Sequence, residues 1–316
     1  MWIPGVSTPG YEKQSPSRAE HDWRTQPVPE GLRFVSPGFQ PRVAPNRKGF
    51  YTVTFPPPRP IRLVTFDLYD TLIEIAPSRW ERLGFALDKL RVAYDLRALC
   101  AADVLAEDFY TEENAKTPIR DLPKSEQDAF RVEYMRRWLL AAGIEADDTL
   151  ARQARYGYQG ELDATPRYGS YRAYDDVVES AQRLREAGVK RAIISNADAD
   201  VTEFVTHLAI AHEMDLIVTS AVVGYEKPDI RTFQAAFEPL GIDPAEALHI
   251  GDQPRSDVVG ALNAGMRAAL IDRYARHDQA VHDVPVMRDF DTLVNYVLDA
   301  NAAAGYEGPI PEESFA

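Results

Sequence analysis

Ile61-Arg-Leu-Val-Thr-Phe-Asp-Leu-Tyr-Asp-Thr-Leu72 begins as a short apolar run and continues into polar residues. The part up to Phe66 is rich in β-branched and aromatic side chains, which is typical of a buried β-strand that ends at Asp67. Strands in which apolar residues follow one another, rather than alternating with polar residues, occur in parallel sheets that are covered on both faces. The sequence therefore predicts a parallel sheet, with Asp67 at the carboxyl end of one strand.

Similar apolar runs recur in the second half of the chain, at 192–195, 216–218, 247–250 and 268–271. Amphipathic helical patterns lie between or beside them, at 174–187, 199–208, 229–240 and 256–264. Strands that alternate with helices at this spacing form βαβ units. We therefore expect a Rossmann-like α/β core, a parallel sheet with helices on both faces.

Residues 77–167 lack strand patterns and contain four amphipathic segments, at 79–90, 99–114, 124–142 and 147–160. This pattern predicts an all-helical cap domain inserted after the first strand. The α/β core would then consist of residues 61–76 and 168–295, followed by a C-terminal tail over 296–316.

The first 60 residues differ in composition from the rest of the chain. They hold 12 of the 23 prolines, with 8 basic and 4 acidic residues. Proline lacks an N–H and fixes φ, so this segment is predicted to be an extended, Pro-rich arm. It is interpreted as a disordered leader, as an upstream stretch included by a wrong start codon, or as a basic arm. A basic arm would dock on its own acidic body or on a neighbouring subunit of a homodimer.

The net charge of −14 resolves into +4 on this arm and −18 on the remainder. An acidic surface repels phosphate backbones and anionic lipid, so we expect no nucleic-acid partner and no membrane partner. Cys100 is the only cysteine, which excludes a disulfide framework and a Cys₄ zinc site. No apolar run is long enough to span a membrane and no signal-peptide pattern is present, so a cytoplasmic location is expected.

Polar residues follow four of the predicted strands. They are Asp67, Tyr69 and Thr71 after the first, Ser195 and Asn196 at the end of the second, Lys227 after the third, and Asp252 and Asp257 after the fourth. In open parallel sheets, ligands bind at the carboxyl ends of the strands. Each residue alone is common in a loop, but together they predict a single site.

The order of these groups resembles the haloacid dehalogenase-like (HAD) hydrolase superfamily, over roughly 62–271, and the inserted helices resemble its helical cap of the first type. The resemblance implies that Asp67 is a nucleophile that forms an aspartyl-phosphate or an ester. Asp67 and Asp252 are hard oxygen ligands suited to Mg²⁺, the expected cofactor. The resemblance adds the Tyr69 main-chain carbonyl as a ligand, and places Asp257 in the metal site behind the ligands or next to Lys227.

The remaining residues have roles that follow from their chemistry. Lys227 supplies positive charge against Asp67 and the substrate oxygens. Ser195, grouped here with Asn196, can hold an incoming anion together with backbone N–H groups. Thr71 can hydrogen-bond the transferred group or the nucleophile.

Tyr69 departs from the phosphatases of the superfamily, which have an aspartate general acid at this position. The 2-haloacid dehalogenases have tyrosine there, and a halide leaving group needs no proton. They are, however, metal-free, with Ser-Ser-Asn where this chain has Gly251-Asp252-Gln253-Pro254 and tyrosine where it has Phe233. Asp70 is not expected to substitute for the acid, because in an extended backbone it points away from Asp67.

We therefore expect a HAD-type hydrolase, a Mg²⁺-dependent phosphatase acting on a small phosphorylated molecule through an Asp67 phosphoryl intermediate. Without the usual acid it would turn over slowly or act on a substrate with a good leaving group, such as an acyl phosphate. Alternatively, Tyr69 or a residue of the cap donates the proton. The alternatives are a metal-free 2-haloacid dehalogenase with an aspartyl ester intermediate, and a catalytically weak binding or assembly subunit.

Other polar and aromatic residues are expected to have structural roles. His249 lies on a buried strand and is predicted to be a core histidine. Arg79, Arg82 and Arg255 are close enough in sequence to reach a substrate, but they are expected to be solvated surface residues. Trp80, Trp138 and the tyrosines of the cap are predicted to form the core of the cap.

Overall fold

A computed structural model describes residues 59–164, 170–277, 283–306 and 308, and the backbone of two strands in the N-terminal segment. These two strands, β1 (Arg42–Pro45) and β2 (Tyr51–Thr54), pair antiparallel. The extended conformation expected of the arm thus includes a short ladder, to which the high β-propensity of Tyr-Thr-Val-Thr contributes. At the end of the arm, Arg59 pairs with Asp243 of the body at 2.7 Å. The other residues before Arg59 lie outside the described residues, and so does their predicted docking on the body or on a second subunit.

The core contains the predicted parallel sheet. Its six strands lie in the order β10-β9-β8-β3-β6-β7, and every neighbouring pair is parallel. Two strands, β3 and β8, lie in the middle. The strands are β3 (Leu63–Phe66), β6 (Lys190–Ser195), β7 (Leu216–Thr219), β8 (Ala247–Gly251), β9 (Arg267–Ile271) and β10 (Val286–Met287).

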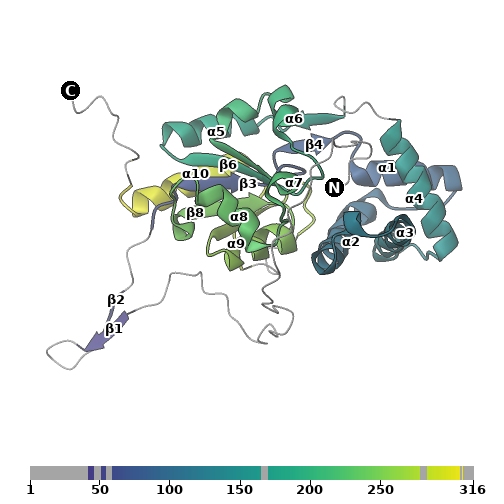
Figure 1. Ribbon diagram of the computed structural model, residues 1–316, viewed down its shortest axis with the longest axis horizontal. Helices are drawn as coiled ribbons and strands as arrows, with labels where there is room; N and C mark the ends of the chain where they lie inside the picture. The colour runs from purple at the N-terminus through teal and green to yellow at the C-terminus, as the bar shows by residue number, and fades with distance from the viewer. Residues whose placement is uncertain are drawn as a thin grey trace.

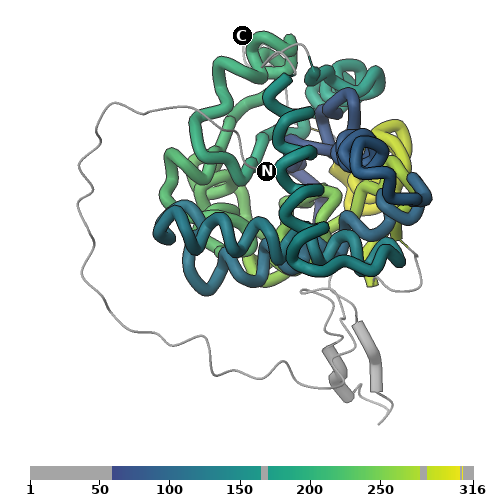
Figure 2. Tube along the Cα trace, turned by 90° about the vertical axis from the view of Figure 1, so that its right-hand side faces the viewer, coloured from purple at the N-terminus to yellow at the C-terminus, as the bar shows by residue number. Residues whose placement is uncertain are grey.

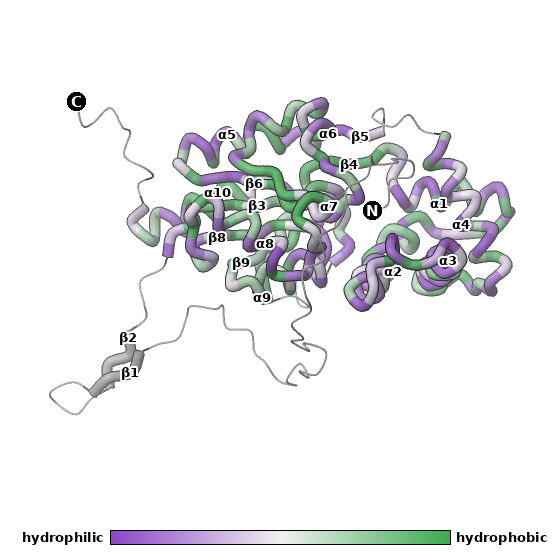
Figure 3. Tube along the Cα trace, viewed as in Figure 1, coloured by the Kyte–Doolittle hydropathy of each residue, from purple (hydrophilic) through white to green (hydrophobic). Residues whose placement is uncertain are grey.

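Helices cover both faces of this sheet, which confirms the predicted Rossmann-like α/β fold (Figure 1). Val64 and Phe66 pack on one face, under α5 (Val177–Glu186), α6 (Thr202–His207) and α10 (Phe290–Ala303). Leu63 packs on the other face, under α8 (Ile230–Phe237) and α9 (Gly260–Asn263). The hydrophobic stretches in Figure 3 accordingly follow β3 and β6 through the interior. Short elements complete the core: α7 (Ser220–Val223), η3 (Ala211–Glu213), η4 (Pro244–Glu246) and the π-helix η5 (Pro254–Val259).

The α10 helix continues across residue 295, where the sequence analysis ended the core. Its Leu293, Val294 and Val297 side chains are fully buried against the sheet, so the packed body extends to the end of this helix. None of the helices in the described part of the chain combines the length and the apolar character needed to cross a membrane.

The segment between the first and second core strands folds as the predicted helical cap. It comprises α1 (Arg79–Leu90), α2 (Leu96–Lys116), η2 (Ile119–Asp121), α3 (Lys124–Ala141) and α4 (Asp148–Asp163). Figure 2 shows these helices together in front of the core. They enclose a core of their own around Trp138, which is fully buried and donates its indole N–H to the Leu99 carbonyl at 2.8 Å. Trp80 belongs to the same buried cluster, as the sequence predicts for both tryptophans.

A two-stranded antiparallel ribbon joins the cap to the core. Its strands are β4 (Ile73–Ile75), which enters the cap, and β5 (Tyr171–Ala173), which leaves it. Ile75 pairs with Tyr171, so the two ends of the cap lie side by side. This ribbon was not predicted from the sequence.

Candidate active site

The predicted site residues gather where the parallel strands end. Asp67 follows β3 directly, and its backbone N–H donates to the Ile250 carbonyl on β8 at 2.9 Å. This bond fixes the nucleophile candidate between two central strands. Only 9% of the Asp67 surface is exposed.

Lys227 joins two carboxylates in this buried space. Its Nζ lies 2.5 Å from Asp67 Oδ1 and 2.6 Å from Asp257 Oδ1. Burial alone would lower the pKa of Lys227, but the negative charges of Asp257 and Asp67 raise it above its usual range. The lysine therefore remains a cation directly beside Asp67, where the sequence analysis expected positive charge.

Asn196 holds the backbone of Lys227 in place. Its Nδ2 donates to the Lys227 carbonyl at 2.9 Å, and the Lys227 N–H donates to its Oδ1 at 2.7 Å. These paired bonds link the end of β6 to the lysine loop. The geometry makes Asn196 a positioning residue for Lys227.

Asp257 has its hydrogen-bonding capacity occupied by protein groups. Besides Lys227, His249 Nε2 lies 3.3 Å from its Oδ1, and the Gln253 N–H donates to its Oδ2 at 2.9 Å. Burial would raise the pKa of Asp257, but Lys227 and His249 hold it well below the usual range. Gly251 allows this close approach, since a Cβ there would lie 2.3 Å from the Asp257 carboxylate.

His249 is the core histidine that the sequence predicts, with no exposed surface. Its Nδ1 lies 2.8 Å from Thr65 Oγ1, and burial lowers its pKa. The imidazole therefore links the interior of the sheet to Asp257, a connection that the sequence analysis did not anticipate.

Asp252 approaches the same point from the end of β8 and is 2% exposed. Its Oδ2 accepts hydrogen bonds from Arg276 at 2.9 Å and from the Gln253 side chain at 2.8 Å. Burial raises the pKa of Asp252 well above its usual range, while Arg276 opposes the shift and Asp70 and Asp67 add to it. Burial likewise raises the pKa of Asp67 to about 6, against the opposing effect of Lys227.

Three carboxylates are close enough to hold one cation. Asp67, Asp252 and Asp257 place one oxygen each within 4.8 Å of one another. Hard oxygen ligands of this kind suit Mg²⁺, which keeps several waters when bound by few protein groups. Because Asp257 is already engaged by Lys227, His249 and Gln253, Asp67 and Asp252 are the better candidates for direct ligands. The role of the Tyr69 main-chain carbonyl as a further metal ligand stays a prediction.

Two hydroxyl groups at the site lack partners. Ser195 Oγ and Thr71 Oγ1 are buried and make no hydrogen bond within the described residues. Buried hydroxyls normally find a partner. Both hydroxyls are thus available to an oxyanion, and the roles predicted for Ser195 and Thr71 stay predictions.

The chain turns sharply after Tyr69. The Tyr69 ring packs against the rings of Tyr171 and Phe204, with centroids 5.9 and 6.4 Å away. Asp70 has a left-handed backbone with φ of 56°, so the extended backbone assumed for it in the sequence analysis is wrong. Its carboxylate does not extend to solvent but pairs with Arg79 Nη2 at 2.9 Å.

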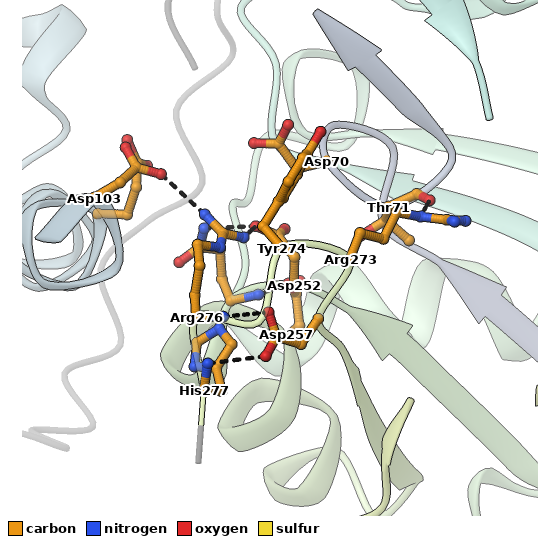
Figure 4. A network of polar contacts seen from close by, with 12 residues as sticks. Asp70, Thr71, Asp103, Asp252, Asp257, Arg273, Tyr274, Arg276 and His277 are labelled. Atoms are coloured by element: carbon orange, nitrogen blue, oxygen red, sulfur yellow. Dashed lines mark hydrogen bonds and ion pairs between the residues drawn. The ribbon is translucent and has the colours of Figure 1, made fainter. Parts of the chain in front are cut away.

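A buried ion network joins the cap to this site. Figure 4 shows Arg276 between Asp103 of α2 and Asp252 of the core. Its Nη1 lies 3.0 Å from Asp103, and Arg79 Nη2 lies 2.7 Å from the same carboxylate. The expectation that Arg79 and Arg82 are solvated surface residues is wrong, because they are 6% and 1% exposed.

Asp103 and Arg276 were not predicted from the sequence. One signal was available for Asp103: it shares an apolar helix face with Leu99, Ala102 and Ala106, where an acid is costly unless it is paired. Arg276 lies in a loop after β9 and carries no comparable signal. Arg255 does lie at the surface, as expected, within 3.5 Å of Glu112.

Comparison with known proteins identifies the family. A family model described as haloacid dehalogenase-like hydrolase matches residues 61–265. The chain belongs to the haloacid dehalogenase-like hydrolase family. The match covers the β3 strand, the inserted cap and the core through α9.

Several curated relatives resemble parts of this haloacid dehalogenase-like hydrolase. The mouse (Mus musculus) haloacid dehalogenase-like hydrolase domain-containing protein 3 is 35% identical over 99 residues, 31% of this chain and 39% of the relative. The glyceraldehyde 3-phosphate phosphatase of Methanothermobacter thermautotrophicus is 31% identical over 134 residues, 40% of this chain and 59% of the relative. The match thus spans less than two thirds of either relative. A protein of the same name from Methanopyrus kandleri is 27% identical over 240 residues, 74% of this chain and 96% of the relative.

Solved structures share the fold of this haloacid dehalogenase-like hydrolase. An L-2-haloacid dehalogenase aligns with a TM-score of 0.51 and 18% identity, over 76% of this chain and 99% of that protein. At this level of identity the likeness concerns the arrangement of the chain, and the chemistry has to be argued from the site.

Proposed function

We propose that this hydrolase is a Mg²⁺-dependent phosphatase that acts on a small organic phosphate. The observation that carries the proposal is the carboxylate of Asp252 beside that of Asp67, with oxygens within 4.8 Å of each other. Without a cation, two neighbouring carboxylates raise each other's pKa and weaken a nucleophile. The phosphatases among the relatives support the same activity.

The residues at the strand ends account for the chemical steps. An oxygen of Asp67 attacks phosphorus and an aspartyl-phosphate forms, while the electron pair of the broken bond leaves with the organic oxygen, which takes a proton from water. Water then attacks this phosphorus, which releases inorganic phosphate and restores the Asp67 carboxylate. Lys227, Ser195 and Thr71 would hold the phosphoryl oxygens, while Asn196 keeps Lys227 in position. Mg²⁺, held by Asp67 and Asp252, would neutralise charge that develops on the transferred group.

Tyr69 favours a second candidate function, that of a 2-haloacid dehalogenase, because halide departs without a proton. Phosphate release from aryl and alkyl phosphates, and halide release from 2-chloropropionate, should therefore be compared with and without Mg²⁺. We expect phosphate release that requires Mg²⁺. Metal-independent halide release would overturn the proposal. Absence of both activities, with an oligomer that is lost on deleting residues 1–60, would instead favour the assembly subunit.

The affinity of the site for Mg²⁺ is expected to decrease as the pH is lowered. Burial raises the pKa of Asp67 to about 6, and that of Asp252 is raised as well. Protons therefore compete with the cation as the pH falls through this range, and affinity should drop about tenfold or more from about pH 7.5 to about pH 5. Isothermal titration calorimetry with MgCl₂ measures this. An affinity that does not change with pH would exclude both carboxylates as ligands.

Restoring an acid at position 69 is expected to speed the hydrolysis of substrates with poor leaving groups. Tyr69→Asp should raise kcat for an alkyl phosphate by about 10²-fold or more, since general acid help is worth 10² to 10⁴. Tyr69→Asn is the matched control, because it removes the same ring from Tyr171 and Phe204 without supplying a proton. Equal kcat values for the two variants would show that the missing acid does not limit turnover.

A further inference from the structure

The cap contains a cavity lined by aromatic rings. Its volume is about 120 Å³, comparable with the roughly 150 Å³ cavity that holds a benzene molecule in an engineered protein. Tyr110 contacts two of the other rings edge to face, with centroids 5.7 and 6.4 Å away. The rings come from α2, α3, α4 and β5: Tyr110, Phe130, Tyr134, Tyr158 and Tyr171. We call this space the cap cavity; its walls favour a flat, apolar group.

Arginines also line the cap cavity. Arg79, Arg131 and Arg155 contribute to its wall against one acid, Glu107. The negative charge of Glu107 is already balanced, because Arg79 Nη1 lies 3.1 Å from the carboxylate and the Tyr134 hydroxyl donates a hydrogen bond to it at 2.7 Å. Arg131 and Arg155 lie near enough to repel each other, while Asp128, which is 2.8 Å from Arg155, and Asp198 both attract Arg131. Arg79 also pairs with Asp70 and Asp103, so the charges of the wall are balanced, and its arginines contribute guanidinium N–H donors beside the rings.

Arg82 adds a buried cation next to these rings. It is 1% exposed, and none of its three guanidinium nitrogens has a hydrogen-bond partner among the described residues. Its charge interacts with Tyr158 and Tyr171, which both line the cap cavity, and more weakly with Glu161 and Glu81. Burying N–H donors that make no hydrogen bond is costly, and an anionic ligand nearby that accepts from them would offset that cost.

The cap cavity adjoins the loop that carries the nucleophile. Arg79, on its wall, pairs with Asp70, and Tyr171, also on its wall, packs against the ring of Tyr69. Asp70 and Tyr69 follow Asp67 closely in the chain. A substrate with its phosphate at Asp67 would therefore direct its organic part toward the cap cavity.

We infer that the cap cavity recognises an aromatic ring bearing a carboxylate, so that the substrate is a carboxylated aryl phosphate. The inference rests on the proposed phosphatase function and names its substrate class. When the bond from phosphorus to the aryl oxygen breaks, the electron pair leaves with that oxygen as a phenolate, which takes a proton from water. A phenolate is a weak base, with a conjugate-acid pKa near 10, and departs more readily than an alkoxide. This chemistry matches a site with tyrosine in place of the general acid.

The test compares 3-carboxyphenyl phosphate, phenyl phosphate and glycerol 3-phosphate in the presence of Mg²⁺. We expect kcat/KM to decrease in that order, with the carboxylate worth about tenfold or more over phenyl phosphate. Arg131→Gln should bring that ratio close to one, mainly by raising KM for the carboxylated substrate. Arg137→Gln is the matched control on the same helix, because Arg137 is half exposed and pairs with Glu133. Equal kcat/KM for all three substrates would overturn the inference.

A binding measurement separates this inference from the proposed function. Isothermal titration calorimetry with 3-carboxyphenylphosphonate, which cannot be hydrolysed at its P–C bond, reports occupancy without turnover. Binding that weakens in Arg131→Gln and in Arg82→Met supports the cap cavity even if no phosphate ester is hydrolysed. A third result would support the phosphatase function but contradict the inferred role of the cap cavity. It is phosphate release without any preference for the carboxylated substrate, together with unchanged phosphonate affinity in both variants. Thermal unfolding of each variant verifies that it is folded.

Discussion

Asp67→Asn should reduce phosphate release at least about 10⁴-fold, because the amide oxygen is a poor nucleophile and cannot form the aspartyl-phosphate. The substitution nearly preserves the size of a side chain that is 9% exposed, so the fold should be retained. Steady-state phosphate release and acid-quench mass spectrometry measure the two expectations. The covalent phosphoryl adduct should form in the natural protein and not in the variant.

Asp200→Asn is the matched control for this experiment. Asp200 also lies in a loop that follows a core strand, but it is exposed and its carboxylate accepts hydrogen bonds only from Thr202 within the described part of the chain. The Asp200→Asn variant should release phosphate at the rate of the natural protein. If Asp67→Asn kept appreciable phosphate release while Asp200→Asn behaved normally, the nucleophile would have to be another group.

Lys227→Met should lower the free energy of unfolding by about 3–5 kcal/mol at neutral pH, because it removes one partner from a buried ion cluster. Asp67 and Asp257 would then face each other without the cation that lies 2.5 and 2.6 Å from them. Urea unfolding without Mg²⁺ measures the loss. It should be accompanied by a large decrease in phosphate release, since the phosphoryl oxygens lose the same positive charge.

Lys190→Met supplies the comparison for Lys227→Met. Lys190 also pairs with an aspartate, Asp215 at 2.9 Å, but its side chain is 53% exposed. Exposed pairs contribute about 0–1 kcal/mol. Equal losses of unfolding free energy in the two variants would mean that the Lys227 cluster is far better solvated than its burial indicates.

The parallel sheet could be predicted because its strands are buried on both faces. Runs such as that ending at Phe66 are mostly apolar, and helical patterns that stop at Gly188, Gly241 and Gly265 lie among them. The β4 and β5 strands could not be predicted in the same way. Each has three residues of mixed exposure, and each is stabilised by its partner at the far end of the cap.

The site was partly predictable for a related reason. Asp67, Ser195 and Asp252 lie at strand ends, and the carboxyl ends of neighbouring parallel strands meet whatever the remainder of the chain does. Arg276 and Asp103 meet only because the cap lies over the core at one particular angle. No local pattern encodes that angle. The extended backbone assumed for Asp70 was wrong for a local reason, the left-handed turn at this residue.

The β4–β5 ribbon has a consequence for how the chain folds. The central pairing of β3 with β6 joins Phe66 to Ile193, residues separated by the whole cap, and closing so long a loop costs conformational entropy. A cap that folds first and pairs Ile75 with Tyr171 shortens that loop to residues 67–74 on one side and 172–192 on the other. Local contacts within the cap would then precede the slow, non-local assembly of the sheet. The same ribbon that carries the cap over the active site would thereby set the order in which the two bodies form.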